Sequence, residues 1–241
     1  MHGDQIDVTE QMVRRLVDDQ FPQWRRLSLR EIASEGTVHA IFRIGDGLAA
    51  RFPLQAADAV EARTRLEAES SAALELAACS PVPTPVPVAL GAPGHDYPLS
   101  WAVQTWLPGR TATVEDPGGS VGFAEDLAVF IAGLRAADTR GRRFAGTGRG
   151  GQLPDHDAWM DVCFRESEGL LDVSCVRRLW GELRSLPAIG PDVMSHGDLI
   201  PGNVLVRGAR LVGVLDVGGF GPADPALDLV AAWHLLEQGP R

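Results

Sequence analysis

The chain has 241 residues, of which 45% are hydrophobic and 22% are charged, and its formal net charge is −10. This length allows one large domain or two small lobes with a sizeable core, and the composition is that of a globular protein. The acidic balance argues against nucleic acid as a main partner, because phosphate backbones are bound by basic faces. It is compatible with a cationic substrate, although solubility explains the charge more simply.

The cysteines and the N-terminal segment indicate the cellular compartment in which the protein is expected. Cys79, Cys163 and Cys175 are far apart and fit neither a disulfide framework nor a zinc spacing. The N-terminal segment is polar and lacks the apolar stretch of a signal peptide. No run approaches the roughly 18 apolar residues of a membrane span. We therefore expect a cytoplasmic protein with no membrane partner.

The first part of the chain predicts a β-rich region with one long helix. A helix over 8–19 is expected to begin at Thr9 as its N-cap, and the Ala-, Glu- and Leu-rich segment 56–78 predicts a longer one. The proline-rich segment 79–93 is expected to run extended. Strands are expected over residues 27–32, 38–44, 48–52, 86–90 and 99–106.

The rest of the chain reads as mainly helical. Leu107-Pro108-Gly109 breaks the pattern, so we place a lobe boundary there, with a nucleotide-binding lobe over 1–106 and a catalytic lobe over 107–241. Helices are expected over 121–137, over 156–186 in two pieces, and over 225–236 with Asp224 as N-cap. Short strands are expected over 204–206 and 211–215. The order predicts an α+β fold with a β-rich first lobe.

The segment from His196 to Asn203 matches the H-x-D-x-x-x-x-N catalytic loop of kinase-type phosphoryl transfer. Such transfer requires an oriented acceptor hydroxyl, a held Mg²⁺ and neutralised phosphate charge. Asp198 can accept a hydrogen bond from the acceptor hydroxyl, and Asn203 and Asp216 offer the hard oxygen ligands that Mg²⁺ prefers. The strands between Asn203 and Asp216 predict a hairpin, whose open ends are neighbours. The two oxygen ligands would thereby converge.

These residues resemble the aminoglycoside phosphotransferase family, which includes macrolide kinases and other small-molecule kinases. The resemblance covers nearly the whole chain and rests on these segments: His196-Gly197-Asp198 with Asn203, Val214-Leu215-Asp216, Asp224-Pro225-Ala226-Leu227-Asp228-Leu229 and Trp106-Leu107-Pro108-Gly109. It implies a two-lobed, protein-kinase-like α+β fold. It also implies ATP or GTP with Mg²⁺ as cofactors and a small-molecule hydroxyl, of an aminoglycoside or macrolide type, as acceptor.

The resemblance further implies roles for individual residues. In the second lobe, Asp198 is expected to be the catalytic aspartate, with His196 and Asp224 supporting its loop, and Asn203 and Asp216 to be the magnesium ligands. In the first lobe, these residues are expected to bind the nucleotide: Arg51 at the phosphates, Glu69 as its helix partner with Glu67 as second choice, and the backbone around Gln104 to Trp106 at the adenine.

The chain departs from the family pattern in several places. Arg51 stands where a lysine is usual; arginine still neutralises phosphate, although an edge-strand arginine could instead simply reach solvent. The usual D-F-G is Asp216-Val217-Gly218, and a glycine-rich loop is replaced by the turn Glu35-Gly36-Thr37. The chain ends where the family continues with further helices. We expect a compact variant, a truncated product or an enzyme whose partner completes the acceptor pocket.

Other motifs give competing interpretations. Gly118 to Gly122 matches the G-x-S-x-G elbow of serine hydrolases, but no core strand precedes Ser120, which reads better as a helix cap. The glycines of 146–151 fit G-x-G-x-x-G without a preceding strand, so a loop is the simpler reading. Asp155, Asp157 and Asp161 could line an acceptor pocket or cap a helix. A catalytically weak nucleotide-binding or regulatory relative is the main alternative to an enzyme.

Overall fold

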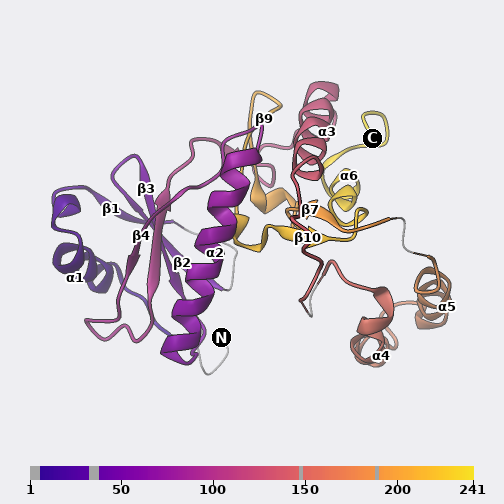
Figure 1. The fold of residues 1–241 in the computed structure, drawn as a ribbon, viewed down its shortest axis with the longest axis horizontal. Coiled ribbons are helices and arrows are strands. Elements are labelled where there is room, and N and C mark those ends of the chain that lie inside the picture. The colour runs from indigo at the N-terminus through magenta and orange to yellow at the C-terminus, as the bar shows by residue number, and fades with distance from the viewer. Residues whose placement is uncertain (1–5, 33–37, 147–148, 188–189) are drawn as a thin grey trace.

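The computed structural model describes residues 6–32, 38–146, 149–187 and 190–241. The first lobe holds one antiparallel sheet in the order β1-β2-β3-β5-β4 with two α-helices beside it (Figure 1). Its elements are α1 (Glu10–Gln20), η1 (Pro22–Trp24), β1 (Leu29–Ile32), β2 (His39–Ile44), β3 (Leu48–Pro53), α2 (Ala59–Cys79), β4 (Pro87–Gly91) and β5 (Trp101–Thr105). The predicted turn Glu35-Gly36-Thr37 lies outside the described residues.

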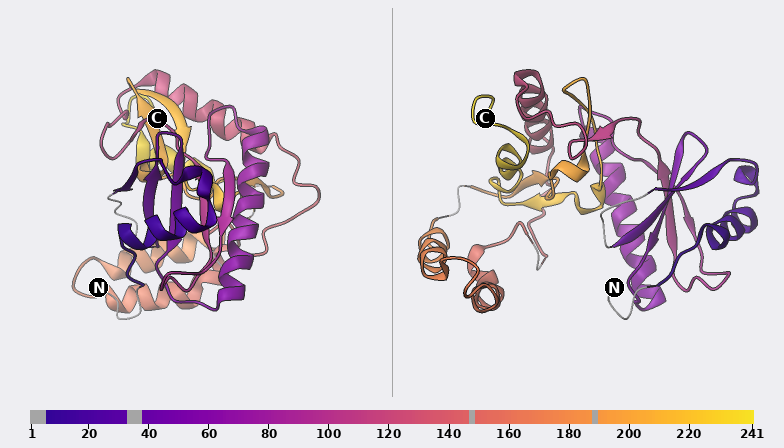
Figure 2. Two further views of the ribbon diagram at one scale, coloured as in Figure 1. Left: turned by 90° about the vertical axis from the view of Figure 1, so that its left-hand side faces the viewer. Right: turned by 180° about the vertical axis from the view of Figure 1, so that it is seen from behind.

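The second lobe combines short strands with helices. The sheet order β6-β8-β9 is separate from the antiparallel pair β7 and β10. Its strands are β6 (Arg110–Thr111), β7 (Val193–Ser195), β8 (Val204–Arg207), β9 (Arg210–Val214) and β10 (Gly221–Ala223). Its helices are α3 (Val121–Arg135), η2 (Leu153–His156), α4 (Asp157–Glu166), α5 (Val173–Leu183), η3 (Pro201–Asn203), η4 (Val217–Gly219), η5 (Leu227–Val230) and α6 (Ala231–Leu235). Helices α4 and α5 stand apart from the remainder of this lobe in both figures (Figures 1 and 2).

Side chains that satisfy free backbone N–H groups set the starts of the main helices. Thr9 Oγ1 accepts the N–H of Met12 at the start of α1, as predicted. Asp58 accepts two backbone N–H groups at the start of α2, and Ser120 accepts the N–H of Phe123 at the start of α3. Each cap is a residue type that favours this position, so the boundaries follow from local sequence.

Helix α2 belongs to both hydrophobic cores. Ala62, near its start, packs with the first-lobe core around Phe52 and Trp101. Ala73 and Leu76, toward its end, pack with the second-lobe core of α3 and the strands that follow. The helix therefore fixes the first lobe against the second, and Figure 1 shows it between them.

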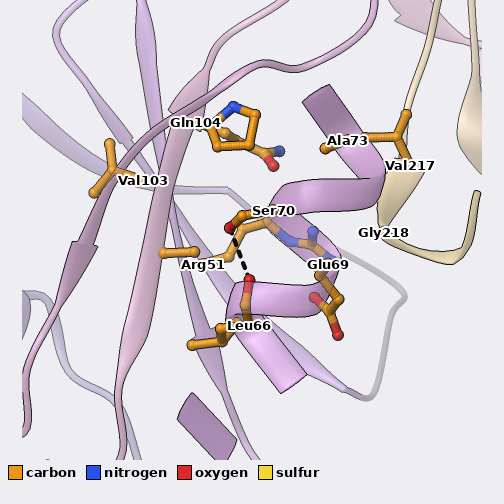
Figure 3. A pocket seen from close by; sticks show the side chains of 11 residues that line it. Arg51, Leu66, Glu69, Ser70, Ala73, Val103, Gln104, Val217 and Gly218 are labelled. Carbon is orange, nitrogen blue, oxygen red and sulfur yellow. Dashed lines mark hydrogen bonds between the residues drawn. The ribbon is translucent and has the colours of Figure 1, made fainter. Parts of the chain in front are cut away.

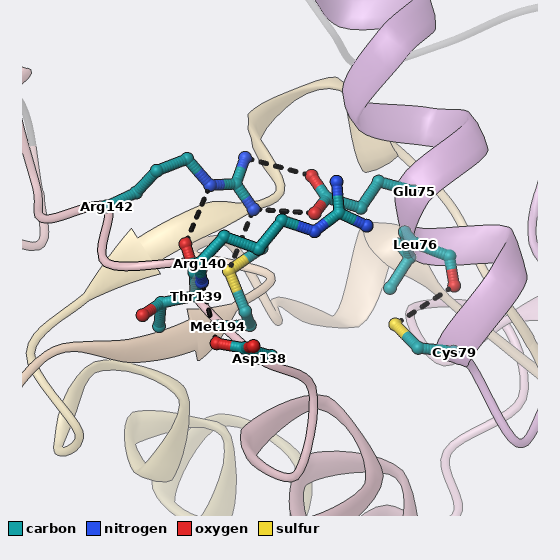
Figure 4. Close-up of polar contacts among 8 residues, drawn as sticks. All are labelled: Glu75, Leu76, Cys79, Asp138, Thr139, Arg140, Arg142 and Met194. Carbon is teal, nitrogen blue, oxygen red and sulfur yellow. Dashed lines mark hydrogen bonds and ion pairs between the residues drawn. The ribbon is translucent and has the colours of Figure 1, made fainter.

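A paired arginine strengthens this connection (Figure 4). Arg142, in the chain after α3, donates from Nη1 and Nη2 to the two carboxylate oxygens of Glu75 at 3.0 and 2.6 Å. The same guanidinium donates to the carbonyl oxygen of Thr139 and contacts Met194 Sδ. The second lobe thus holds the side of α2 by hydrogen bonds as well as by apolar packing.

The predicted α+β, two-lobed arrangement is confirmed, with two local corrections. The single helix expected over 225–236 is a 3₁₀ turn, η5, followed by the short α6. The pair β7 and β10 was not predicted, because strands this short leave no periodic signal and β10 contains Gly221-Pro222. The chain leaves the first sheet after Thr105 and enters another at Arg110; the boundary at residue 106 stays a prediction.

Within the described ranges, no helix combines the length and apolar character needed to cross a bilayer.

Candidate active site

A buried carboxylate holds the start of the H-x-D-x-x-x-x-N loop, which runs from β7 to η3. Asp228 is 3% exposed and accepts the backbone N–H groups of His196 and Gly197, each at 2.8 Å. Gly197 has φ +83°, a conformation that glycine adopts without strain. The carboxylate thus fixes the backbone immediately before Asp198.

His196 supports the same loop from inside. Its ring is 1% exposed, and Nε2 lies 2.9 Å from the carbonyl oxygen of Leu215, to which it donates. Nδ1 then accepts the backbone N–H of Asp198 at 3.3 Å, which corresponds to the neutral ring. The imidazole therefore joins the catalytic loop to the residue before Asp216.

The expected support from Asp224 is corrected by these contacts. The carboxylate of Asp224 accepts the N–H of Ala226 at 2.8 Å, and the backbone N–H of Asp224 donates to Gly150. The carboxylate that reaches the catalytic loop is Asp228, four residues later. Both aspartates belong to the Asp-Pro-Ala-Leu-Asp segment, so its composition alone did not distinguish them.

The hairpin between Asn203 and Asp216 forms as predicted. Val204 pairs with Val214, and the N–H of Leu215 donates to the carbonyl oxygen of Asn203 at 2.7 Å. Asn203 Nδ2 donates to the backbone oxygen of Asp198 at 2.9 Å and to its Oδ2 at 3.2 Å. The amide oxygen of Asn203 is thereby left for another partner, and Asp198, Asn203 and Asp216 form one group of oxygen donors.

Arg51 enters this group from the first lobe. Its Nη2 lies 3.0 Å from Asp216 Oδ1, and the two side chains are 14% and 50% exposed. Asp216 itself has left-handed backbone angles, φ 54° and ψ 56°, at the sharp turn into η4. The structure therefore brings Arg51 into contact with the candidate metal ligand, instead of leaving it in solvent.

Glu69, and not Glu67, lies at this site. Glu69 lines a small cavity together with Arg51, Gln104, Val217 and Gly218 (Figure 3). Glu67 pairs with Arg63 along the helix surface, where both side chains are about half exposed. Among the described residues, the ion pair of Arg51 is with Asp216 and not with Glu69. Burial raises the pKa of Glu69, and the nearby Arg51 opposes that rise.

The two residues expected near adenine differ in position. Gln104 lies in β5, between β3 and β4, and its side chain faces the small cavity (Figure 3). The N–H of Trp106 donates to the carbonyl oxygen of Gly47 at 2.8 Å, and Arg43 lies over its ring at 5.0 Å. The roles of both residues at the nucleotide stay predictions.

His39 lies near Arg51, and the sequence reasoning did not consider it. It begins β2, and its cross-strand partner is Pro53, two residues from Arg51 on the same strand. Burial lowers its pKa to about 4, with the positive charge of Arg51 as the second cause. The ring is therefore neutral near Arg51 at neutral pH. A histidine at the start of a short strand carries no sequence signal of this kind.

Arg149 was also missed. Its Nη1 lies 2.6 Å from Asp198 Oδ1, although the two residues are 49 positions apart. Its glycine-rich segment lies in the loop before η2, and no periodicity or motif connects that segment with the catalytic loop.

The remaining candidates lie elsewhere. Ser120 Oγ caps α3 and donates to the carbonyl oxygen of Ala209 at 3.0 Å, so its role is structural. Asp157 pairs with Arg184, and Asp161 pairs with Arg177, all within the region of α4 and α5. Within the described residues, no cluster of three or more His, Cys, Asp or Glu side chains could hold a metal ion.

Comparisons with known proteins identify the family. The model of the "Phosphotransferase enzyme family" matches residues 28–241, and the chain belongs to that family. The chain is 29% identical over 150 residues to an aminoglycoside 3'-phosphotransferase of Escherichia coli, covering 57% of this chain and 53% of the relative. A Salmonella typhimurium aminoglycoside 3'-phosphotransferase matches to the same extent. The chain thus spans about half the length of these curated relatives.

Solved structures share the fold. The GDP complex of wild-type aminoglycoside 2'-phosphotransferase-IIIa aligns with TM-score 0.71 and 18% identity, covering 95% of this chain and 79% of that chain. A macrolide 2'-phosphotransferase of Brachybacterium faecium aligns with TM-score 0.64 and 22% identity, covering 92% and 79% of the two chains. The predicted kinase-like fold is confirmed by these similarities.

Proposed function

We propose that this chain transfers the γ-phosphate of ATP or GTP to a hydroxyl of a small molecule, of an aminoglycoside or macrolide type. The observation that carries the proposal is the convergence of Asp198, Asn203 and Asp216 at the base of one hairpin, with Arg51 on Asp216. Family membership, and relatives that are aminoglycoside phosphotransferases, support it.

The donor set at this position fits Mg²⁺. Asp216 supplies a half-exposed carboxylate. Asn203 Nδ2 donates to Asp198, which leaves the amide oxygen of Asn203 as a possible metal ligand. Carboxylate and amide oxygens, together with nucleotide phosphates, are ligands that Mg²⁺ prefers. When bound, the ion would neutralise phosphate charge. Asn203 and Asp216 are the residues that would hold it.

Proton acceptance, phosphate binding and positioning of the loop are assigned to different side chains. Asp198 accepts a hydrogen bond from the acceptor hydroxyl and takes its proton as the hydroxyl oxygen bonds to the γ-phosphorus. The bond between that phosphorus and the oxygen that bridges the β- and γ-phosphates breaks, and the nucleoside diphosphate leaves with that oxygen. Arg51 offers the nucleotide phosphates a planar, permanently charged donor. His196 and Asp228 act as positioning residues, because both hold the loop and neither reaches solvent.

The experiment is a screen of acceptors with γ-labelled ATP and GTP. Kanamycin, gentamicin, streptomycin and a macrolide are incubated with each nucleotide and Mg²⁺, and label transfer is measured. We expect Asp198→Asn to lower kcat by about 100-fold or more, since a positioned proton acceptor contributes roughly 10²–10⁴ in rate. Asp7→Asn, at an exposed position, serves as control. Chelation with EDTA should abolish transfer, and excess Mg²⁺ should restore it.

Two results would contradict this proposal. The first is nucleotide-induced stabilisation with no transfer to any acceptor, which would favour a binding or regulatory relative. The second is transfer that persists at the wild-type rate in Asp198→Asn.

A further inference from the structure

The carboxylate at the centre of the candidate site is in contact with an arginine that the proposed mechanism does not use. Arg149 Nη1 lies 2.6 Å from Asp198 Oδ1. The Arg149 side chain is 67% exposed, whereas that of Asp198 is 27% exposed. A guanidinium has five N–H donors, and this contact uses one of them. Arg149 therefore reaches the proposed reaction centre, and within the described ranges this is the one side-chain contact of its guanidinium.

The backbone immediately after Arg149 is anchored to the second lobe. The carbonyl oxygen of Gly150 accepts the N–H of Asp224 at 3.0 Å. Gly150 has φ +115°, and a Cβ there would lie 3.0 Å from both Ala223 Cβ and the ring of Phe144. Glycine is required by this backbone angle and by the close packing. The backbone that carries Arg149 is thus held in place beside β10.

Phosphoryl transfer at Asp198 would place the negatively charged phosphoryl group close to the Arg149 guanidinium. The acceptor oxygen lies between Asp198 and the transferring phosphorus, so a group that contacts Asp198 is also near the phosphoryl oxygens. Residues 199–202 of the loop are Leu, Ile, Pro and Gly and supply no charge. Arg51 makes its ion pair with Asp216 and, among the described residues, has none with Asp198. Arg149 is therefore the cationic side chain, among the described residues, that contacts Asp198.

We propose that Arg149 binds the transferring phosphoryl group. One N–H of its guanidinium keeps a hydrogen bond to Asp198, and the other N–H donors contact the equatorial oxygens as negative charge spreads over them. Arg149 would then stabilise the transition state more than the bound nucleotide. This inference rests on the proposed phosphotransferase function and adds a residue to it.

The same contact permits the opposite interpretation, in which Arg149 only occupies the place of the acceptor hydroxyl. In that case Arg149 must leave before the reaction, and its removal would raise the turnover rate or leave it unchanged. The two interpretations therefore predict opposite signs for the change in kcat.

The test compares Arg149→Ala and Arg149→Lys with the matched control Arg143→Ala, an exposed arginine of the same loop. Thermal stabilisation is measured with Mg·ADP alone and with Mg·ADP plus aluminium fluoride, which mimics the transferring phosphoryl. Label transfer gives kcat and the acceptor KM. We expect Arg149→Ala to keep the ADP shift, lose the additional fluoride-dependent shift, and lower kcat by about 100-fold with KM changed less than about threefold. Arg149→Lys should recover part of kcat, and Arg143→Ala should match the wild type.

The outcomes separate this inference from the function beneath it. An Arg149→Ala variant with wild-type or higher kcat, or with an undiminished fluoride-dependent shift, overturns the role of Arg149 and leaves the phosphotransferase intact. A wild type that binds ADP but transfers no phosphate contradicts the function, while the fluoride comparison still decides Arg149. A wild type without any ADP shift overturns both.

Discussion

Gly218 lies against Glu69 so closely that no side chain fits between them. A Cβ on Gly218 would be 2.9 Å from Glu69 Cγ and 3.0 Å from Glu69 Cβ. Gly218 follows the candidate metal ligand Asp216 by two residues, and Glu69 lies on α2. The backbone of η4 and the side chain of Glu69 close to the α2 backbone are both held by packing, so neither can move far to make room for a side chain. This contact therefore sets how near α2 comes to the turn that follows the candidate metal ligand Asp216.

Gly218→Ala should displace α2 from η4. We expect a loss of about 1–3 kcal/mol in the free energy of unfolding, because an added methyl in a filled contact forces neighbouring groups to shift. Chemical unfolding in urea measures it. The matched control is Gly219→Ala, in the same turn, where the nearest atom to a Cβ is the carbonyl oxygen of His196 at 3.8 Å. Equal effects of the two substitutions would show that the contact with Glu69 is unimportant.

Asp228→Asn tests the support of the catalytic loop. The variant keeps one acceptor oxygen but brings an NH₂ group against a backbone N–H donor, in a position that is 3% exposed. We expect a loss of about 1–3 kcal/mol of stability, the range for a buried donor left unsatisfied, and a lower kcat. Asp224→Asn should lose about 1 kcal/mol or less, since it changes one turn contact to Ala226. Comparable losses from both substitutions would restore Asp224 as a supporting residue.

His39 predicts a pH dependence of stability. Its pKa in the fold is about 4, below the ordinary histidine value of 6.5, so the unfolded chain binds the proton more readily. The contribution is therefore present above about pH 6.5 and lost as the pH falls toward 4. Between pH 7.5 and 5.5 we expect a decrease of about 1.3 kcal/mol in the free energy of unfolding from this group. His39→Gln, which does not titrate, should show a correspondingly flatter profile in urea unfolding, and an identical profile would contradict the assignment.

The pair of Glu75 and Arg142 is predicted to contribute to the connection between the lobes (Figure 4). A double-mutant cycle of Glu75→Gln and Arg142→Gln should give a coupling of about 0.5–1 kcal/mol, reduced by the partial exposure of both side chains. The control cycle is Arg63 with Glu67 on the same helix, where both side chains are about half exposed and about 0.3–0.5 kcal/mol is expected. A coupling at Glu75 no larger than the control would show that apolar packing alone holds α2.

Several features could be predicted because their causes are local. Thr9 and Ser120 cap helices through contacts three residues away, so the residue type and its position were sufficient. The hairpin from Asn203 to Asp216 follows from two apolar strands around a short turn. The last helix was predicted too long because Asp224-Pro225 resembles a helix start, whereas the chain there forms the 3₁₀ turn η5 first.

Three features could be predicted from the amino-acid order alone: the candidate catalytic loop, the hairpin that brings Asn203 to Asp216, and a β-rich lobe before a helical one. Which distant groups meet at this site depends on the packing of the whole chain. Arg51 and Asp216 are 165 positions apart and Arg149 and Asp198 are 49 apart, and no spacing rule predicts such contacts. The lowered pKa of His39 likewise depends on burial and on the charge of Arg51, which exist only after the sheet and α2 have packed. Local hydrogen bonds follow short-range sequence, whereas burial and charge pairing follow from the packed chain as a whole.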